Sequence, residues 1–287
     1  MRYVFSLSTI PPRFGMLGPA LRSLLKQTVR PEAVDLYIPR RYRRFPQWSG
    51  SLPDVPEGVR IVQVDEDLGP ATKILPAARS YRGQDLDIIY VDDDRIFAND
   101  WARTCLGVRR DHPDTVICAT GFRIAQRFGL PDPGTREPVA KLVTHPLAET
   151  RFILGWSWNS FLAGITAGGM RKPYVHRVEQ SGFVDVAEGY GGVMVRPDFF
   201  DDEAFRIPPV AWPVDDIWLS GMFARRGVPI WADRSLYKVN EVMKTSRHFP
   251  LYRTVIDGAD RMQSNRACID HMRQAYRIWG GEATQST

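Results

Sequence analysis

The stretch Ile88–Ile89–Tyr90–Val91–Asp92–Asp93–Asp94 consists of four apolar or aromatic residues followed by three carboxylates. A short run of this composition is typical of a buried strand. In open parallel sheets ligands bind beyond the carboxyl ends of the strands, where these three carboxylates would stand. The run therefore predicts a strand that ends in an acidic site. The alternative is an exposed acidic turn that caps a helix near Asn99.

Similar short runs recur through the first 120 residues, and amphipathic stretches separate them. We predict strands at residues 3–8, 34–38, 60–64, 87–91 and 116–120, and helices at 17–27, 74–81 and 99–110. This alternation predicts an α/β fold whose mainly parallel sheet is covered by helices on both faces.

The second half of the sequence is less regular. Residues 131–138 are rich in turn formers, and residues 152–170 mix aromatics with glycines, so we expect loops around a site or an interface there. Regular structure is expected to resume with strands at 191–195 and 229–232 and helices at 216–226 and 257–279, before a frayed tail.

The composition of the chain is that of a globular protein. It has 287 residues, of which 44% are hydrophobic and 25% charged, which excludes disordered and fibrous classes. Nothing in it approaches the roughly 20 consecutive apolar residues of a membrane helix, and no signal segment precedes the first strand, so we expect a cytoplasmic protein. The three cysteines (Cys105, Cys118 and Cys268) are too scattered for a disulfide framework and are predicted to be buried thiols.

The net charge of +5 is a reason to consider anionic partners. Only Arg40–Arg41–Tyr42–Arg43–Arg44 forms a dense basic cluster. One alternative is therefore a non-catalytic protein that docks on nucleic acid or membrane through this cluster. Its binding would depend strongly on salt and would be indifferent to Asp94.

The three consecutive carboxylates also suggest a metal. Adjacent carboxylates repel each other unless a cation neutralises them, and hard oxygen ligands suit Mg²⁺ or Mn²⁺, which would in turn bind a substrate diphosphate. Because side chains alternate along an extended segment, Asp92 and Asp94 are expected to face one way and Asp93 the other. Asp94, together with Asp92, is therefore the predicted metal ligand.

Two basic residues stand where an anion could bind. Gly69 and Pro70 break the chain before a predicted helix, which places Lys73 in the first turn beside free backbone N–H groups. Arg13 follows the first strand. For each residue the alternative is an ordinary solvated side chain.

The order of these motifs resembles that of nucleotide-sugar glycosyltransferases with the GT-A fold, and most of all the family-two-like bacterial enzymes. The resemblance covers about residues 2–232 and is carried by the DxD-like residues 92–94 together with the segments 6–13, 67–73, 188–192 and 215–220. It implies a Rossmann-like, mainly parallel sheet with a smaller mixed region on the acceptor side. The implied division is a nucleotide-sugar-binding half at 1–125, an acceptor-binding and catalytic half of the same domain at 126–256, and a C-terminal helix and tail at 257–287.

The resemblance also implies an activity. A sugar would move from a nucleotide-diphosphate donor, expected to be UDP-linked, to a saccharide or a lipid-linked or other glycoconjugate, with Mn²⁺ or Mg²⁺ as cofactor. No nucleic-acid partner is implied, and a peripheral contact with the inner face of a membrane is compatible with such an acceptor. Inversion is favoured, although the residues leave retention open.

The implied donor-binding residues are Thr9, Pro11, Arg13, Asp67, Gly69, Lys73, Asp92, Asp93 and Asp94. The candidate sugar- or acceptor-binding residues are Tyr190, Gly191, Gly192 and Trp158, because glycines let the backbone approach a ligand closely and aromatic rings can stack on a sugar; a glycine bulge and a core tryptophan are the structural alternatives. The implied metal ligands are Asp94, Asp92 and His248, the last of which is otherwise a surface histidine.

A carboxylate pair at the start of a predicted helix supplies the candidate base. Sugar transfer passes through an oxocarbenium-like state and needs a carboxylate to deprotonate the acceptor hydroxyl. In similar inverting enzymes that base belongs to the motif matched by Asp215 and Asp216. Asp216 is the first candidate and Asp215 the second. Favourable interaction with the helix dipole is the structural alternative.

A sugar-nucleotide nucleotidyltransferase is a second enzymatic alternative. Such enzymes carry a glycine-rich basic loop after the first strand, which residues 8–13 lack. No GxSxG, HExxH or GxxxxGK[ST] motif occurs, which argues against hydrolases of those classes, zincins and P-loop proteins.

Overall fold

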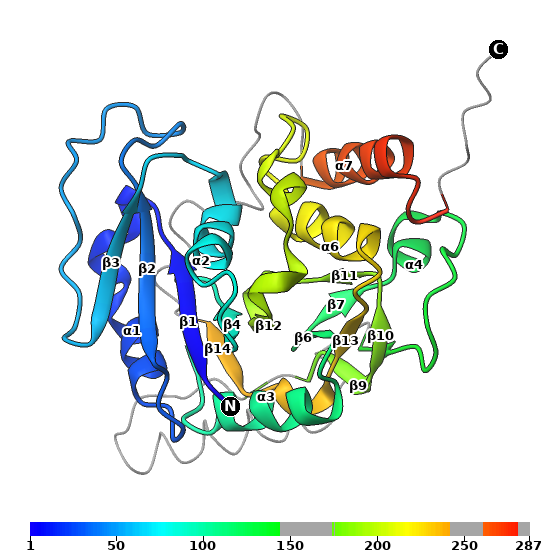
Figure 1. The fold of residues 1–287 in the computed structure, drawn as a ribbon, viewed down its shortest axis with the longest axis horizontal. Coiled ribbons are helices and arrows are strands. Elements are labelled where there is room, and N and C mark those ends of the chain that lie inside the picture. Colours follow the sequence, from blue (N-terminus) through cyan, green and yellow to red (C-terminus); the bar gives the residue numbers. More distant parts are fainter. Residues whose placement is uncertain (144–173, 175, 242–260, 281–287) are drawn as a thin grey trace, which may run out of the picture.

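The computed structural model describes residues 1–143, 174, 176–241 and 261–280 (Figure 1). Eight strands form its main sheet in the order β10-β13-β6-β12-β4-β1-β2-β3. Their bounds are β1 Tyr3–Ser8, β2 Ala33–Pro39, β3 Val59–Val64, β4 Asp87–Tyr90, β6 Val116–Cys118, β10 Gly182–Val184, β12 Val193–Val195 and β13 Ile230–Ala232.

Helices cover both faces of this sheet, as the alternating pattern predicted. They are α1 Gly18–Leu25, α2 Leu75–Ser80, α3 Trp101–Asp111, α4 Ile124–Phe128, α6 Asp215–Arg225 and α7 Arg261–Tyr276. The described part of the chain is thus an α/β fold with a mostly parallel sheet.

Successive side chains of the central strands enter two different cores. Ile88 and Tyr90 of β4 pack in the core that contains α2, α6 and α7, whereas Ile89 packs with α1 and α3. Both faces of β4 are therefore buried, which explains why its sequence reads as a continuous apolar run rather than an alternating one.

The middle of the sheet contains an antiparallel strand. β12 pairs antiparallel with both β4 and β6, whereas β1 pairs parallel with β2 and β4. Strands from the first and second halves of the sequence therefore share one sheet, and the segment before β12 is brought to the carboxyl end of β4.

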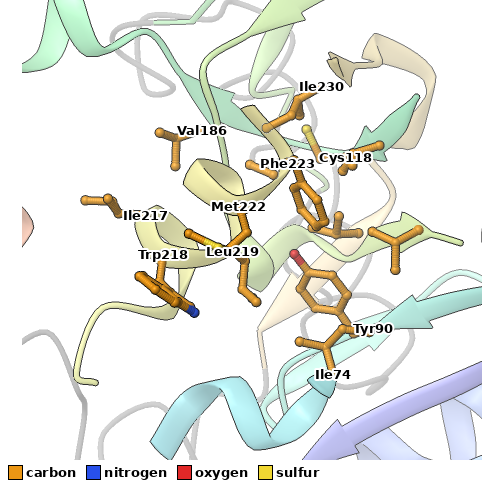
Figure 2. Packing of buried hydrophobic residues seen from close by; sticks show 14 of the residues in the cluster. Ile74, Tyr90, Cys118, Val186, Ile217, Trp218, Leu219, Met222, Phe223 and Ile230 are labelled. Atoms are coloured by element: carbon orange, nitrogen blue, oxygen red, sulfur yellow. The ribbon is translucent and has the colours of Figure 1, made fainter. Parts of the chain in front are cut away.

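Helix α6 is buried on nearly all sides. Figure 2 shows Trp218, Leu219, Met222 and Phe223 of this helix packed with Tyr90 and other apolar residues of the core. Burial on this scale fixes the position of the first turn of α6, which carries Asp215 and Asp216.

Some elements were not predicted. Three two-stranded sheets join β5 Arg95–Phe97 to β14 Val239–Glu241, β7 Gly121–Phe122 to β11 Val186–Ala187, and β8 Lys141–Leu142 to β9 Val178–Gln180. The aromatic and glycine-rich residues 152–170 lie outside the described residues. None of the described helices is long and apolar enough to cross a membrane.

Candidate active site

A cavity of about 370 Å³ lies beyond the carboxyl ends of β1, β2 and β4. Thr9 follows β1, Pro39 ends β2, and residues 92–94 follow β4, and all of these line the cavity. The volume is within the range of about 300–1,000 Å³ that is usual for small-molecule sites. The acidic run thus stands at the strand ends predicted from its position.

Asp93 and Asp94 share a basic partner. Asp93 accepts hydrogen bonds from Thr9 Oγ1 at 2.5 Å and from Arg13 Nη1 at 2.7 Å, and the same Arg13 nitrogen lies 3.9 Å from Asp94 Oδ2. Arg95 Nε is 3.2 Å from Asp94 Oδ1. The predicted alternation of Asp92 and Asp94 against Asp93 is therefore wrong, because β4 ends at Tyr90 and residues 93–94 form a turn.

Burial perturbs the charges of these acids. It raises the pKa of Asp93, against the opposing effect of Arg13, and raises the pKa of Asp94 to about 6. Burial also acts to lower the pKa of Arg13, but the negative charges of Asp93 and Asp94 outweigh it and raise that pKa. Arg13 is buried and ion-paired, so the alternative of an ordinary surface arginine is wrong.

Lys73 lies between the acidic run that follows β4 and the acidic pair at the start of α6. Its Nζ lies 2.7 Å from Asp92 Oδ1 and 3.0 Å from Asp215 Oδ2, and its side chain is only 8% exposed. Burial alone would lower the pKa of Lys73, but Asp215 and Asp92 raise it well above the usual value. The alternative of a solvated lysine is therefore wrong.

The predicted position of Lys73 in the first turn of a helix is also wrong. Lys73 is the last residue of a 3-10 turn, Gly69–Lys73, and α2 begins only at Leu75. Thr72 Oγ1 accepts a hydrogen bond from the N–H of Leu68 within that turn. The lysine therefore reaches the carboxylates from a turn that the Gly69–Pro70 break initiates.

Asp215 and Asp216 have different environments although they are adjacent. The Asp215 side chain is 4% exposed and held by Lys73, whereas that of Asp216 is 18% exposed. Asp216 Oδ1 accepts the N–H of Gly189 at 3.0 Å, and its Oδ2 lies 3.7 Å from Arg261 Nη2. Burial and the neighbouring Asp215 raise the pKa of Asp216 to about 7, although Lys73 acts in the opposite direction.

The glycine-rich segment before β12 lies beside Asp216 and Lys73. It forms a 3-10 turn, Gly189–Gly191. Tyr190 lines the main cavity, and Arg95 Cζ lies 5.1 Å from the centre of its ring. Gly191 lines a smaller adjoining cavity of about 70 Å³. Gly192 has φ +86° and lies so close to Trp101 that a β-carbon there would be 2.8 Å from the indole, so its need for glycine is structural.

One wall of the cavity is built from both halves of the sequence. Trp212 Nε1 donates to the backbone oxygen of Asp67 at 3.2 Å, and Asp67 Oδ1 accepts the N–H of Gly69 at 2.9 Å. A β-carbon on Gly69, which has φ +61°, would stand 2.9 Å from the indole of Trp212. The three residues therefore form a closely packed rim.

Three further predicted site residues are not among the described residues that line the cavity. Pro11 begins the 3-10 turn Pro11–Met16 and does not line the described cavities. Trp158 and His248 lie outside the described residues. Cys105, Cys118 and Cys268 are buried free thiols, as predicted.

The arginine cluster at residues 40–44 does not present a single basic surface. Arg40 pairs with Asp65 at 2.9 Å, and Arg43 lies over the ring of Trp212. Arg44 lines the cavity and makes no ion pair with any described residue, while burial and the nearby Arg13 lower its pKa. Docking through the whole cluster is thus disfavoured.

Sequence reasoning missed several residues that line the cavity. They are Arg44, Arg95, Arg127, Arg261 and Asn265. Arg44 belongs to the basic cluster at residues 40–44, in which no local pattern indicates a link to the site. Arg261 and Asn265, at the start of α7, are far in the sequence from the motifs at residues 6–13, 67–73, 92–94, 188–192 and 215–220.

The acidic residues fit a metal that is held jointly with a substrate. Within the described residues no group of three or more metal-binding side chains converges. However, Asp94 Oδ1 is buried and makes no hydrogen bond, although Arg95 Nε lies 3.2 Å from it, and Asp92 lines the same cavity. Mg²⁺ is commonly held by one or two carboxylates together with substrate phosphates and water. Asp94 and Asp92 match that donor set.

Neither a family model nor a curated protein matches the sequence. Among solved structures, S. aureus TarS 1-349 in complex with UDP has a TM-score of 0.43 at 12% identity and covers 97% of this chain and 72% of its own. The same fragment with UDP-GlcNAc has a TM-score of 0.40 at 14% identity, over 82% of this chain and 56% of its own. A longer TarS chain is covered over only 35% of its length. Similarity at this level does not identify the family of the chain.

Proposed function

We propose that this protein is a metal-dependent glycosyltransferase. It moves a sugar from a nucleotide-diphosphate donor, expected to be UDP-linked, to a hydroxyl of a saccharide or glycoconjugate, with inversion. The observation that supports this most is the position of Lys73 between Asp92 and Asp215. Lys73 connects Asp92, which belongs to the acidic run suited to a metal–diphosphate complex, with Asp215, which belongs to the second carboxylate pair, suited to proton transfer.

The donor diphosphate is proposed to bind at the ends of β1 and β4. Arg13 and Lys73 offset its charge, and Asp94 with Asp92 holds Mg²⁺ or Mn²⁺. When bound, that metal would supply a Lewis acid that offsets negative charge on the departing nucleoside diphosphate. Because the pKa of Lys73 is raised well above its usual value, Lys73 stays protonated and acts by its charge alone.

Asp216 is the proposed base. Asp215 is occupied by its ion pair with Lys73, whereas Asp216 Oδ2 makes no hydrogen bond to any described residue. A pKa of about 7 leaves much of Asp216 deprotonated at neutral pH while keeping it a stronger base than an ordinary carboxylate.

The proposed step is a single displacement. The acceptor oxygen forms a bond to the anomeric carbon as the bond between that carbon and the diphosphate oxygen breaks, and the electron pair of that bond leaves with the diphosphate. The acceptor proton moves to Asp216 Oδ2. Asp216 is the only proton acceptor that the step requires.

Thermal shift with nucleotides tests the proposal. UDP, GDP, ADP and UDP-sugars are added with and without Mn²⁺ to the wild type, to Asp94→Asn, and to the control Asp114→Asn, which alters an exposed acid away from the cavity. A ligand at 100 times its Kd stabilises a protein by about 2.7 kcal/mol. We expect a Mn²⁺-dependent shift in the wild type and control that is lost in Asp94→Asn, together with sugar transfer from the shifting donor. No shift with any nucleotide, or equal shifts in all three proteins, would refute it.

A further inference from the structure

Helix α7 is firmly docked on α6, beside which it lies in Figure 1. Met272 is fully buried against Gly221 of α6, where a β-carbon would stand 2.4 Å from Met272 Cε. Tyr276 packs edge-on to Trp218, and its hydroxyl donates to Glu203 at 2.7 Å. These contacts fix the rotation of α7 and therefore the direction of its first turns.

The first turns of α7 present two polar side chains to the cavity. Arg261 and Asn265 are four residues apart, so they share a face of the helix, and both line the cavity. Asn265 is only 7% exposed, yet its amide makes no hydrogen bond to any described residue. The amide lines the cavity, so a ligand or water bound there can complete its hydrogen bonds.

Arg261 connects this pair to the proposed base. Its Nη2 lies 3.7 Å from Asp216 Oδ2, beyond hydrogen-bond distance, and its side chain makes no hydrogen bond to any described residue. The donor-side acids have other partners, since Asp93 is bound by Arg13 and Asp92 by Lys73. The α7 pair therefore adjoins the acceptor side.

We infer that Arg261 and Asn265 form the subsite for the acceptor saccharide, which rests on the function proposed above. Asn265 both donates to and accepts from hydroxyls, and Arg261 donates to hydroxyl or ring oxygens. Together they hold the groups that flank the hydroxyl directed at Asp216 Oδ2. The part of the acceptor that binds here is expected to be a neutral polyol rather than an anion. The two nearby arginines already face carboxylates, since Arg261 faces Asp216 and Arg127 is paired with Glu188 at 2.6 Å.

Saturation-transfer NMR with simple glycosides tests this subsite. The probes are the neutral methyl glycosides of glucose, galactose and N-acetylglucosamine and the anionic methyl glucuronide, each with UDP and Mn²⁺ present. The variants are Asn265→Leu and Arg261→Gln. The matched control is Arg266→Gln, which alters an exposed α7 residue that donates to Phe128 O and does not line the cavity.

At least one neutral glycoside should bind the wild type and Arg266→Gln. Its affinity should fall at least tenfold in Asn265→Leu and in Arg261→Gln, while UDP affinity stays within twofold. Glycoside binding that is unchanged in both variants, equal loss of UDP affinity, binding of the glucuronide alone, or no glycoside binding by the wild type would overturn the inference.

Two measurements keep the outcomes separable. Melting temperatures show whether Asn265→Leu is folded. If it is not, Arg261→Gln decides the question, because Arg261 is 30% exposed and its replacement leaves no buried charge on α7. Turnover of a nucleotide sugar by the wild type establishes the proposed function independently. If the wild type turns over a nucleotide sugar but the α7 variants bind glycosides as well as the wild type does, the subsite alone is refuted. If the wild type binds no nucleotide, the proposed function is refuted.

Discussion

A β-carbon added to Gly189 would stand 2.6 Å from Lys73 Nζ and 3.1 Å from Asp216 Oδ1. The absence of a side chain therefore allows the backbone to approach the charged residues, and any larger residue would require Lys73 Nζ to move. The same closeness allows the N–H of Gly189 to donate to Asp216.

Gly189→Ala should leave the protein folded but displace Lys73 from its two carboxylates. We expect sugar transfer to fall by about a hundredfold, as is typical when catalytic groups move by about 1 Å. The control is Gly107→Ala in α3, where the nearest atom to a new β-carbon is 4.0 Å away, and which should be neutral or stabilise by up to about 1 kcal/mol. Equal turnover by the two variants would contradict the role given to Gly189.

Lys73→Met should destabilise the fold by about 3–5 kcal/mol, because it leaves buried Asp92 and Asp215 without their cation. Lys141→Met removes a lysine that is 58% exposed and paired with Glu179, and should cost less than about 1 kcal/mol. Urea unfolding at pH 7 measures both. If Lys73→Met lowers the free energy of unfolding by less than about 1 kcal/mol, the ion pairs of Lys73 do not stabilise the fold.

Turnover should depend on pH through Asp216. As a base it must be deprotonated, so below its pKa of about 7 the rate should rise roughly tenfold per pH unit and level off above it. Asp216→Asn should abolish transfer and the pH dependence together. Retained turnover in that variant would move the role of base to another residue.

Asp216→Asn should also stabilise the protein at alkaline pH. The pKa of Asp216 rises from 3.8 to about 7 in the folded state, so the native protein loses stability as pH increases through this window. The asparagine at position 216 carries no titratable group. The variant should therefore have a higher melting temperature than the wild type at pH 8, with no such gain at pH 4. Asp215→Asn removes an ion pair to Lys73 and should lower the melting temperature. Similar shifts for the two variants would contradict these assignments.

Arg44→Ala should weaken binding of UDP but not of uridine. Arg44 lines the cavity without an ion-pair partner among the described residues, so an anionic ligand would complete its interactions. Loss of a charge-assisted hydrogen bond of about 1.5–3 kcal/mol corresponds to roughly a ten- to hundredfold loss of UDP affinity by calorimetry. Arg41→Ala, in the same cluster but exposed, should have no effect. An equal loss for uridine would assign Arg44 to the nucleoside instead.

The sheet and much of the site could be predicted because their signals are local. The predicted strand at residues 3–8 has the bounds of β1, and the predicted helix at 216–226 differs from α6 by one residue at each end. Asp92 could be recognised because it follows the end of β4 by two residues, and Asp216 because it lies in the first turn of α6.

The rest depends on contacts between distant segments. Nothing near Gly189 indicates that β12 runs antiparallel between β4 and β6, and it is this arrangement that brings the glycine to Lys73. The alternation expected for Asp92 and Asp94 failed because the strand stops at Tyr90. Arg261 reaches the cavity only because α7 packs on α6.

The pairing of β12 with β4 has a consequence for how substrates enter. Val193 is in register with Tyr90, so backbone hydrogen bonds connect the strand that leads into Asp92 with the strand that follows Gly189. A hinge that separated the two sides of the cavity would have to break the centre of the sheet. The spacing between the side of the cavity that carries Asp92 and the side that carries Gly189 is therefore preformed, and under the proposed function we expect substrates to enter by movement of loops and side chains rather than by closure of two lobes.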